Sequence, residues 1–223
     1  MRKFSQNSIK IMVLTAILTA TVIVLQLLGS FIKLGMFSIS LVLIPIIIGA
    51  AICGVGAGAW LGLVFGVTVL LSGDAAAFLV VNPFGTIVTV LVKGILAGLI
   101  SGVVYKAFVE ICNKKQSVSD GDEPQNISKS KEIIVRYLPV IMAAVVCPIV
   151  NTGIFLVGCN LFFYDTVSQW GMALGYENAA SYMILGLAGG NFIFEFLFNL
   201  FISPTVVRIL DIFSHRFAAK TQK

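Results

Sequence analysis

Long apolar runs separated by shorter polar stretches form the dominant pattern of this amino-acid sequence. The runs do not alternate apolar and polar residues, as strands of a membrane β-barrel would. A helix needs about 20 apolar residues to cross a bilayer. The pattern predicts six transmembrane helices: 9–28, 40–52, 56–71, 86–108, 134–158 and 181–203. The second and third are short and meet at the sequence CGVGAG, which indicates a tight hairpin.

Composition strengthens the membrane interpretation. Hydrophobic residues make up 58% of the chain, charged residues make up 11%, and the mean hydropathy is +1.02. An ordinary soluble domain has about 25% charged residues. We therefore predict an all-α integral membrane protein that forms a single six-helix domain over residues 1–223, embedded in the lipid bilayer.

Basic residues predict the orientation of these helices. They cluster before the first helix, around the loop between the fourth and fifth, and after the sixth: Arg2, Lys3, Lys10, Lys106, Lys114, Lys115, Lys129, Lys131, Arg136, Arg208, Arg216, Lys220 and Lys223. The loops predicted on the other side contain a single basic residue, Lys33. Because basic loops stay in the cytoplasm, both termini are predicted to be cytoplasmic. The net charge of +5 reflects this topology and gives no indication of nucleic-acid binding.

The loops on the two sides differ in character. Residues 112–132 are continuously polar and predict a flexible cytoplasmic linker between four helices and two. The outer loops are long and apolar. Their aromatic residues Tyr164, Trp170 and Tyr176 fit either a lid over a binding site or an aromatic belt at the membrane surface.

Two predicted helices contain glycines at four-residue spacing. These are Gly58, Gly62 and Gly66 in the third helix and Gly94, Gly98 and Gly102 in the fourth. Each set lies on one helix face, where two backbones can approach closely. We interpret both sets as internal helix packing.

The sequence lacks the residues of a membrane enzyme. Its single histidine, His215, lies in the predicted cytoplasmic tail, and no P-loop, G-x-S-x-G or H-E-x-x-H motif is present. The four cysteines are scattered and have no ligand-like spacing. We therefore expect no enzymatic activity, no metal site and no cofactor.

Polar residues inside the predicted helices are the best candidates for a binding site, because a charge at membrane depth is costly unless it is paired or faces a cavity. Lys93, Asn151 and Asn191 fall at comparable depths, and Glu195 follows Asn191 on the same helix face. These four residues are predicted to line a pocket that opens outward. The alternative is a structural bridge between Lys93 and Glu195, with the asparagines bonding helices together.

The outer loop before the fourth helix adds two candidate substrate-binding residues, Asn82 and Phe84. Phe84 and the phenylalanines of NFIFEFLFNLF are expected to supply apolar walls, which small-molecule sites usually have. A minority of these rings is expected to touch a ligand.

The segment TAILTA contains Ala16 and Ala20, an Ala-x-x-x-Ala step in the first predicted helix. The chain resembles the substrate-binding S components of bacterial energy-coupling factor (ECF) vitamin transporters. It shares with them this step, six predicted helices, termini predicted to be cytoplasmic, and the Ile-Pro and glycine-rich sequence of residues 41–62. The resemblance implies a multi-pass protein of the bacterial cell membrane. It also implies that Ala16 and Ala20 dock against an ECF module, which consists of a transmembrane coupling protein and two ATPases.

The same resemblance implies capture of a water-soluble vitamin outside and its delivery inward after docking. Pantothenate is favoured because its carboxylate suits Lys93. The stretch FSISLVLIP lacks the aspartate usual in riboflavin-specific members, yet riboflavin, folate and a pyrimidine precursor of thiamin remain open. Two other classes also remain open: an ion-coupled secondary transporter that uses Lys93 and Glu195, and a membrane scaffold without a ligand.

Overall fold

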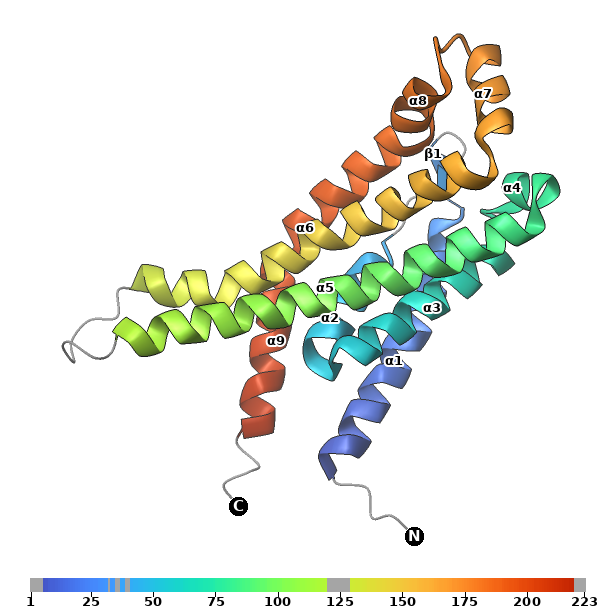
Figure 1. Ribbon diagram of the computed structural model, residues 1–223. Coiled ribbons are helices and arrows are strands. Elements are labelled where there is room, and N and C mark those ends of the chain that lie inside the picture. Colours follow the sequence, from blue (N-terminus) through green and yellow to red (C-terminus); the bar gives the residue numbers. More distant parts are fainter. Residues whose placement is uncertain (1–5, 32, 35–36, 39–40, 120–128, 219–223) are drawn as a thin grey trace.

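The computed structural model describes residues 6–31, 33–34, 37–38, 41–119 and 129–218, and these residues are almost entirely helical (Figure 1). One short antiparallel pair joins β1 (Lys33–Leu34) and β2 (Phe37–Ser38). The helices are α1 (Gln6–Gly29), α2 (Leu43–Cys53), α3 (Val55–Ser72), α4 (Ala76–Val81), α5 (Pro83–Ser119), α6 (Lys129–Phe162), α7 (Tyr164–Ala173), α8 (Ala179–Ser181), the π-helix η1 (Tyr182–Gly189) and α9 (Gly190–Ala218). The predicted all-α architecture is confirmed.

Within the described ranges, five helical segments are long and apolar enough to cross a membrane: Ser8–Gly29, Val55–Ser72, Pro83–Lys114, Tyr137–Phe162 and Ala179–Leu210. The one predicted transmembrane helix that is not among these five, 40–52, corresponds to α2, which has only 11 residues. At 1.5 Å per residue α2 is about 16 Å long, roughly half of the hydrocarbon core. The prediction of six membrane-spanning helices, of which the second and third are short, is therefore corrected to five long helices and one short one among the described residues.

The apolar character of α2 comes from burial inside the protein. Leu43 and Ile46 are fully buried, as is Val42 just before the helix. The helix contacts α1, α3, α5, α6 and α9. A helix that is hydrophobic on all sides suits such a central position as well as it suits lipid, which explains why the apolar pattern alone overestimated its role as a span.

The predicted tight hairpin is present between α2 and α3. Gly54 alone separates Cys53 from Val55 and has a φ of 96°. L-residues with side chains rarely adopt this conformation, whereas glycine does so without steric cost. The chain thereby reverses direction within one residue, and α3 returns alongside α2.

The two glycine sets bring α3 and α5 into backbone contact, as predicted. A Cβ atom on Gly62 would overlap the carbonyl oxygen of Gly94, and one on Gly58 would lie 2.6 Å from the carbonyl oxygen of Gly98. Only glycine allows this separation, since real Cβ atoms do not approach a backbone oxygen so closely. The pair α3 and α5 therefore forms a closely packed unit that carries part of the site described below.

Gly62→Ala should destabilise the protein by about 1–3 kcal/mol, the usual cost of overpacking a well-packed interior. The measurement is the thermal unfolding of the purified protein in detergent. Gly56→Ala on the same helix is the matched control, because a Cβ there meets no atom within 4 Å. Equal stability of the two variants would contradict the close contact between α3 and α5.

Helical structure extends into the segment 112–132, which the sequence predicts to be a flexible linker. Helix α5 continues to Ser119 and α6 begins at Lys129. Residues 120–128 lie outside the described residues. Extending an existing helix costs far less than starting one, and lysine and glutamine are good helix formers. A polar composition therefore does not end a helix that is already formed.

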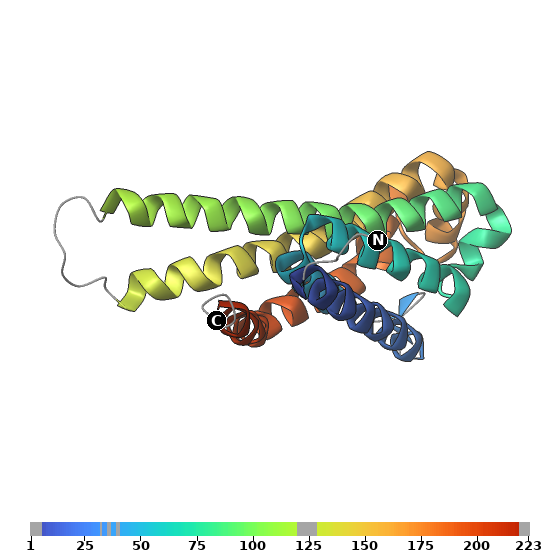
Figure 2. The same cartoon turned by 90° about the horizontal axis from the view of Figure 1, so that it is seen from below.

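The outer loops and the chain ends lie at opposite ends of the bundle. Figure 1 shows that α1 begins and α9 ends at one end, whereas β1, α4, α7 and α8 lie at the other. Figure 2 shows α1 at the outside of the bundle and α5 beside α6, the pair with the most extensive contact. This arrangement agrees with the predicted grouping of the loops. Which end faces the cytoplasm stays a prediction.

Candidate substrate-binding site

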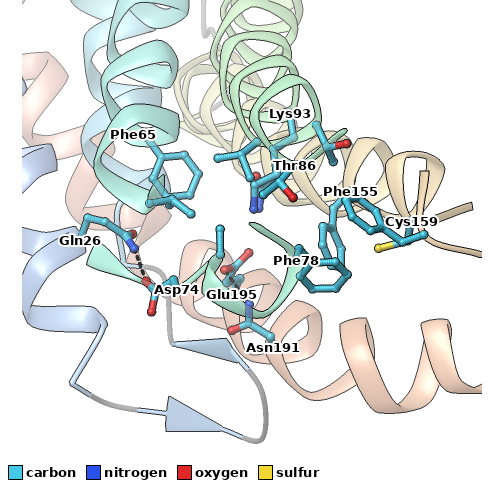
Figure 3. A pocket seen from close by; sticks show the side chains of 16 residues that line it. Gln26, Phe65, Asp74, Phe78, Thr86, Lys93, Phe155, Cys159, Asn191 and Glu195 are labelled. Atoms are coloured by element: carbon cyan, nitrogen blue, oxygen red, sulfur yellow. Dashed lines mark hydrogen bonds between the residues drawn. The ribbon is translucent and has the colours of Figure 1, made fainter. Parts of the chain in front are cut away.

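A pocket lies among α1, α3, α4, α5, α6 and α9 near the end of the bundle that holds α4 and α7 (Figure 3). Four of the predicted site residues line it together: Lys93 from α5, Asn151 from α6, and Asn191 and Glu195 from α9. The other lining residues are Gln26, Phe65, Val69, Asp74, Ala75, Phe78, Thr86, Thr89, Val90, Phe155, Cys159 and Phe163. The structure thus brings together polar residues separated by about a hundred positions in the sequence.

Lys93 lies in an aromatic environment. Its ammonium is 5.6 Å from the ring centroid of Phe65 on α3 and 5.4 Å from that of Phe155 on α6. An ammonium over a ring face is attracted by the negative π-surface, by roughly 0.5–2 kcal/mol. These contacts stabilise a positive charge inside an apolar bundle while leaving its three N–H donors unused by the rings.

Glu195 is held by its neighbour one turn earlier. Nδ2 of Asn191 donates to Oε1 of Glu195 over 3.2 Å, as expected for residues four apart on one helix face. Glu195 is only 2% exposed, and its second oxygen, Oε2, accepts no hydrogen bond from the described residues. The predicted polar face of the last helix is therefore present, and one carboxylate oxygen within it has no partner.

A second polar cluster joins α1 to the pocket. Nε2 of Gln26 donates to Oδ2 of Asp74 over 2.6 Å, and Oγ of Ser72 donates to the same oxygen over 3.1 Å. Sequence reasoning missed Gln26 and Asp74. The available signal was the four-residue spacing of Leu18, Val22 and Gln26, all of them buried, which places the glutamine on the inner face of α1.

Aromatic rings close the pocket toward α7. Phe78 of α4 makes edge-to-face contacts with Phe155, Phe163 and Trp170, with ring centroids 5.8, 5.0 and 5.5 Å apart. Tyr176 packs on Tyr182 at 5.2 Å. Both Trp170 and Tyr176 are partly buried against this aromatic cluster, an arrangement that suits a cover over the site. Tyr164 is exposed, as a residue of an aromatic belt would be.

Two predicted site residues lie elsewhere. Phe84 is 71% exposed and does not line the pocket. Oδ1 of Asn82 accepts a hydrogen bond from the backbone N–H of Gly85 and so caps the start of α5. None of the phenylalanines of α9 is a lining residue either. The phenylalanines that line this pocket come from α3, α4, α6 and the α6–α7 junction, and a role of Phe84 and the α9 rings in ligand binding stays a prediction.

The pocket can therefore bind a small molecule through one ammonium, two carboxylates, several amides and an apolar rim. The model of one protein family, described as "ECF transporter, substrate-specific component", matches residues 10–207, which is most of the chain. The protein belongs to this ECF transporter family. Neither the curated proteins nor the solved structures include a match.

Membership of the ECF family confirms the resemblance found in the sequence. It identifies the protein as the substrate-specific component of an ECF transporter, a multi-pass membrane protein and not an enzyme. The two competing classes, an independent secondary transporter and a membrane scaffold, are therefore set aside. The family covers α1 to α9, so the pocket lies wholly within the matched region.

Proposed function

We propose that this ECF component captures a water-soluble vitamin on the outer side and delivers it inward when docked to an energising module of one coupling protein and two ATPases. Pantothenate is the favoured substrate. The observation that carries this proposal is Lys93, an ammonium that lines the pocket beside two phenyl rings. A charge-assisted hydrogen bond from this ammonium suits the carboxylate of pantothenate.

The rest of pantothenate also matches the chemistry of the lining. Its two methyl groups suit the side chains of Phe65, Phe155 and Val90, and its hydroxyl and amide groups suit the polar residues of α6 and α9. Riboflavin, folate and a pyrimidine precursor of thiamin are the competing vitamins. These molecules contain aromatic rings, which pantothenate lacks, and their binding would depend more on stacking.

The proposal is tested by purifying the protein in a mild detergent and identifying co-purified small molecules by mass spectrometry. Pantothenate is then titrated into ligand-free protein by calorimetry, beside riboflavin, folate and the aminopyrimidine. We expect pantothenate to be retained and to bind most tightly. Retention of another vitamin, with no heat from pantothenate, would reject pantothenate but keep the capture of a vitamin. Binding of no vitamin would reject both.

The location of Ala16 and Ala20 supports the proposed docking of α1. Both are exposed, whereas Leu18 and Val22 are buried. Residues two apart on a helix point about 200° apart, so the small residues occupy the outward face of α1. Small residues let the backbone of a second helix approach closely and gain van der Waals contact, whereas large side chains would hold the two backbones apart. This face suits a partner helix within the membrane.

The proposed orientation predicts which loops a membrane-impermeant thiol reagent reaches. In a variant lacking Cys53, Cys112, Cys147 and Cys159, a cysteine at Gln169 on α7 should react in intact cells. A cysteine at Gln125 should react only after the cells are permeabilised. The basic residues on the Gln125 side are the physical reason, because they are retained in the cytoplasm. The reverse labelling pattern would overturn the orientation and the outward-facing pocket.

A further inference from the structure

Several buried polar atoms of the pocket have no partner among the described residues. They are Oγ1 of Thr89, Oδ1 of Asn151, Oδ1 of Asn191 and Oε2 of Glu195. All four residues line the same pocket. Most buried polar side-chain atoms in proteins make at least one hydrogen bond. Four unsatisfied atoms gathered around one pocket therefore require a common explanation.

The four atoms can all accept hydrogen bonds. Nδ2 of Asn191 donates to Glu195, which directs Oδ1 of the same amide away from the carboxylate. A carboxylate oxygen and an amide oxygen can only accept, and a hydroxyl oxygen accepts as well as donates. Asn151, Glu195 and Thr89 are 5%, 2% and 6% exposed, so bulk solvent does not satisfy these atoms. The group is complementary to hydrogen-bond donors.

The backbone is shaped to admit one of these side chains. A Cβ atom on Gly158 of α6 would overlap the hydroxyl and methyl groups of Thr89 on α5. Glycine at position 158 therefore leaves room for a polar side chain that forms no hydrogen bond within the described residues. Helix packing alone does not explain a threonine there, because valine has the same shape and carries no hydroxyl to desolvate.

We infer that Thr89, Asn151, Asn191 and Glu195 form an acceptor subsite for a part of the substrate that carries two or more hydrogen-bond donors, such as hydroxyl or N–H groups. The inference rests on the proposed function and adds a requirement to it. Lys93 faces an acceptor group of the substrate, and the subsite faces its donors. An anion that lacks donors would leave the four acceptors desolvated and unpaired, which is costly.

The first test compares pantothenate with N-(3,3-dimethylbutanoyl)-β-alanine, which keeps the carbon skeleton, the carboxylate and the amide but lacks both hydroxyls. We expect the analogue to bind at least about 100-fold more weakly, because sites built around a substrate hydroxyl strongly reject analogues without it. Thr89→Val and Asn151→Leu should each weaken pantothenate binding about 2- to 10-fold and reduce the discrimination between the two compounds. Equal binding of both compounds would overturn the inference.

The second test needs no ligand. In ligand-free protein, Thr89→Val should raise the melting temperature by about 2 °C or more, because it removes a buried hydroxyl that has no partner among the described residues. Thr68→Val is the control. Thr68 is buried on α3 outside the pocket, and its hydroxyl donates to the carbonyl of Val64 over 2.8 Å. This variant should leave pantothenate affinity unchanged and should not raise the melting temperature.

The two tests separate this inference from the choice of vitamin. If pantothenate does not bind at all, the proposed substrate fails, and the melting temperatures alone judge the subsite. A fall in melting temperature for Thr89→Val would show that water or the protein satisfies this hydroxyl, and the inference would be wrong. A rise would sustain a donor-binding site for a different vitamin.

Discussion

Lys93→Met should weaken vitamin binding about 30- to 150-fold, the equivalent of 2–3 kcal/mol for the loss of a charge-assisted hydrogen bond. Methionine keeps most of the length and the apolar contacts of the lysine stem beside Phe65 and Phe155 but removes the ammonium. An ammonium in a membrane-spanning helix costs at least about 2.5 kcal/mol on insertion scales. Recognition of the substrate would account for a residue retained at such a cost. Calorimetry with pantothenate measures the effect.

Two further variants distinguish binding from a structural role. Lys106→Met lies on the same helix, is exposed and is remote from the pocket, so it should leave affinity unchanged. If Lys93 serves only to balance Glu195, the single variant should be less stable. The double variant Lys93→Met with Glu195→Leu should then regain stability. An unchanged affinity in Lys93→Met would remove the lysine from the site.

Replacing Ala16 and Ala20 together by leucine should abolish vitamin uptake into cells while leaving the affinity of the isolated protein nearly unchanged. Both residues lie on the outward face of α1, opposite the buried Leu18 and Val22. Added side chains there prevent close approach of a partner helix, yet they contact lipid in the isolated protein. Transport assays and co-purification with the ECF module measure one effect, and calorimetry measures the other.

A bulky substitution elsewhere on the membrane-facing surface controls for a general effect on insertion. Ala107→Leu on α5 serves this purpose, because Ala107 is exposed within a long apolar span. It should support normal uptake. Normal uptake and co-purification in the Ala16 and Ala20 double variant would show that TAILTA has no role in docking.

The sequence was sufficient to predict the long helices, because each contains a long and predominantly apolar run, and the hairpin at Gly54, because glycines are concentrated there. It was insufficient for α2. Residues of the core and residues facing lipid are equally apolar, so hydropathy does not reveal that Leu43 and Ile46 are buried by protein. It was also insufficient for α7 (Tyr164–Ala173), a helix too short and too mixed in composition to stand out within an outer loop.

The residues of the pocket could also be recognised only in part from the sequence. Lys93 and Glu195 were recognisable as charges in apolar runs, and the structure brings them to one pocket. Thr89 was not recognisable, because a single hydroxyl costs little in a helix and can bond its own backbone. The sequence did not distinguish Phe65 and Phe78, which line the pocket, from Phe84, which does not line it. A phenylalanine gives no sign in the sequence of whether it meets lipid, protein or ligand.

The π-helical segment η1 (Tyr182–Gly189) has a consequence for the angular alignment of residues far along the same helix. Met183, Leu187, Asn191 and Glu195 recur every four residues, and each four-residue step overshoots a full α-helical revolution by about 40°. Three such steps would carry the row about 120° around the axis. A π-turn is wider, with i→i+5 hydrogen bonds, so four residues fall short of a revolution there. The π-helical segment therefore offsets part of this rotation. As a result, Met183 and Leu187, which pack in an aromatic cluster, share one helix face with Glu195, which lines the pocket.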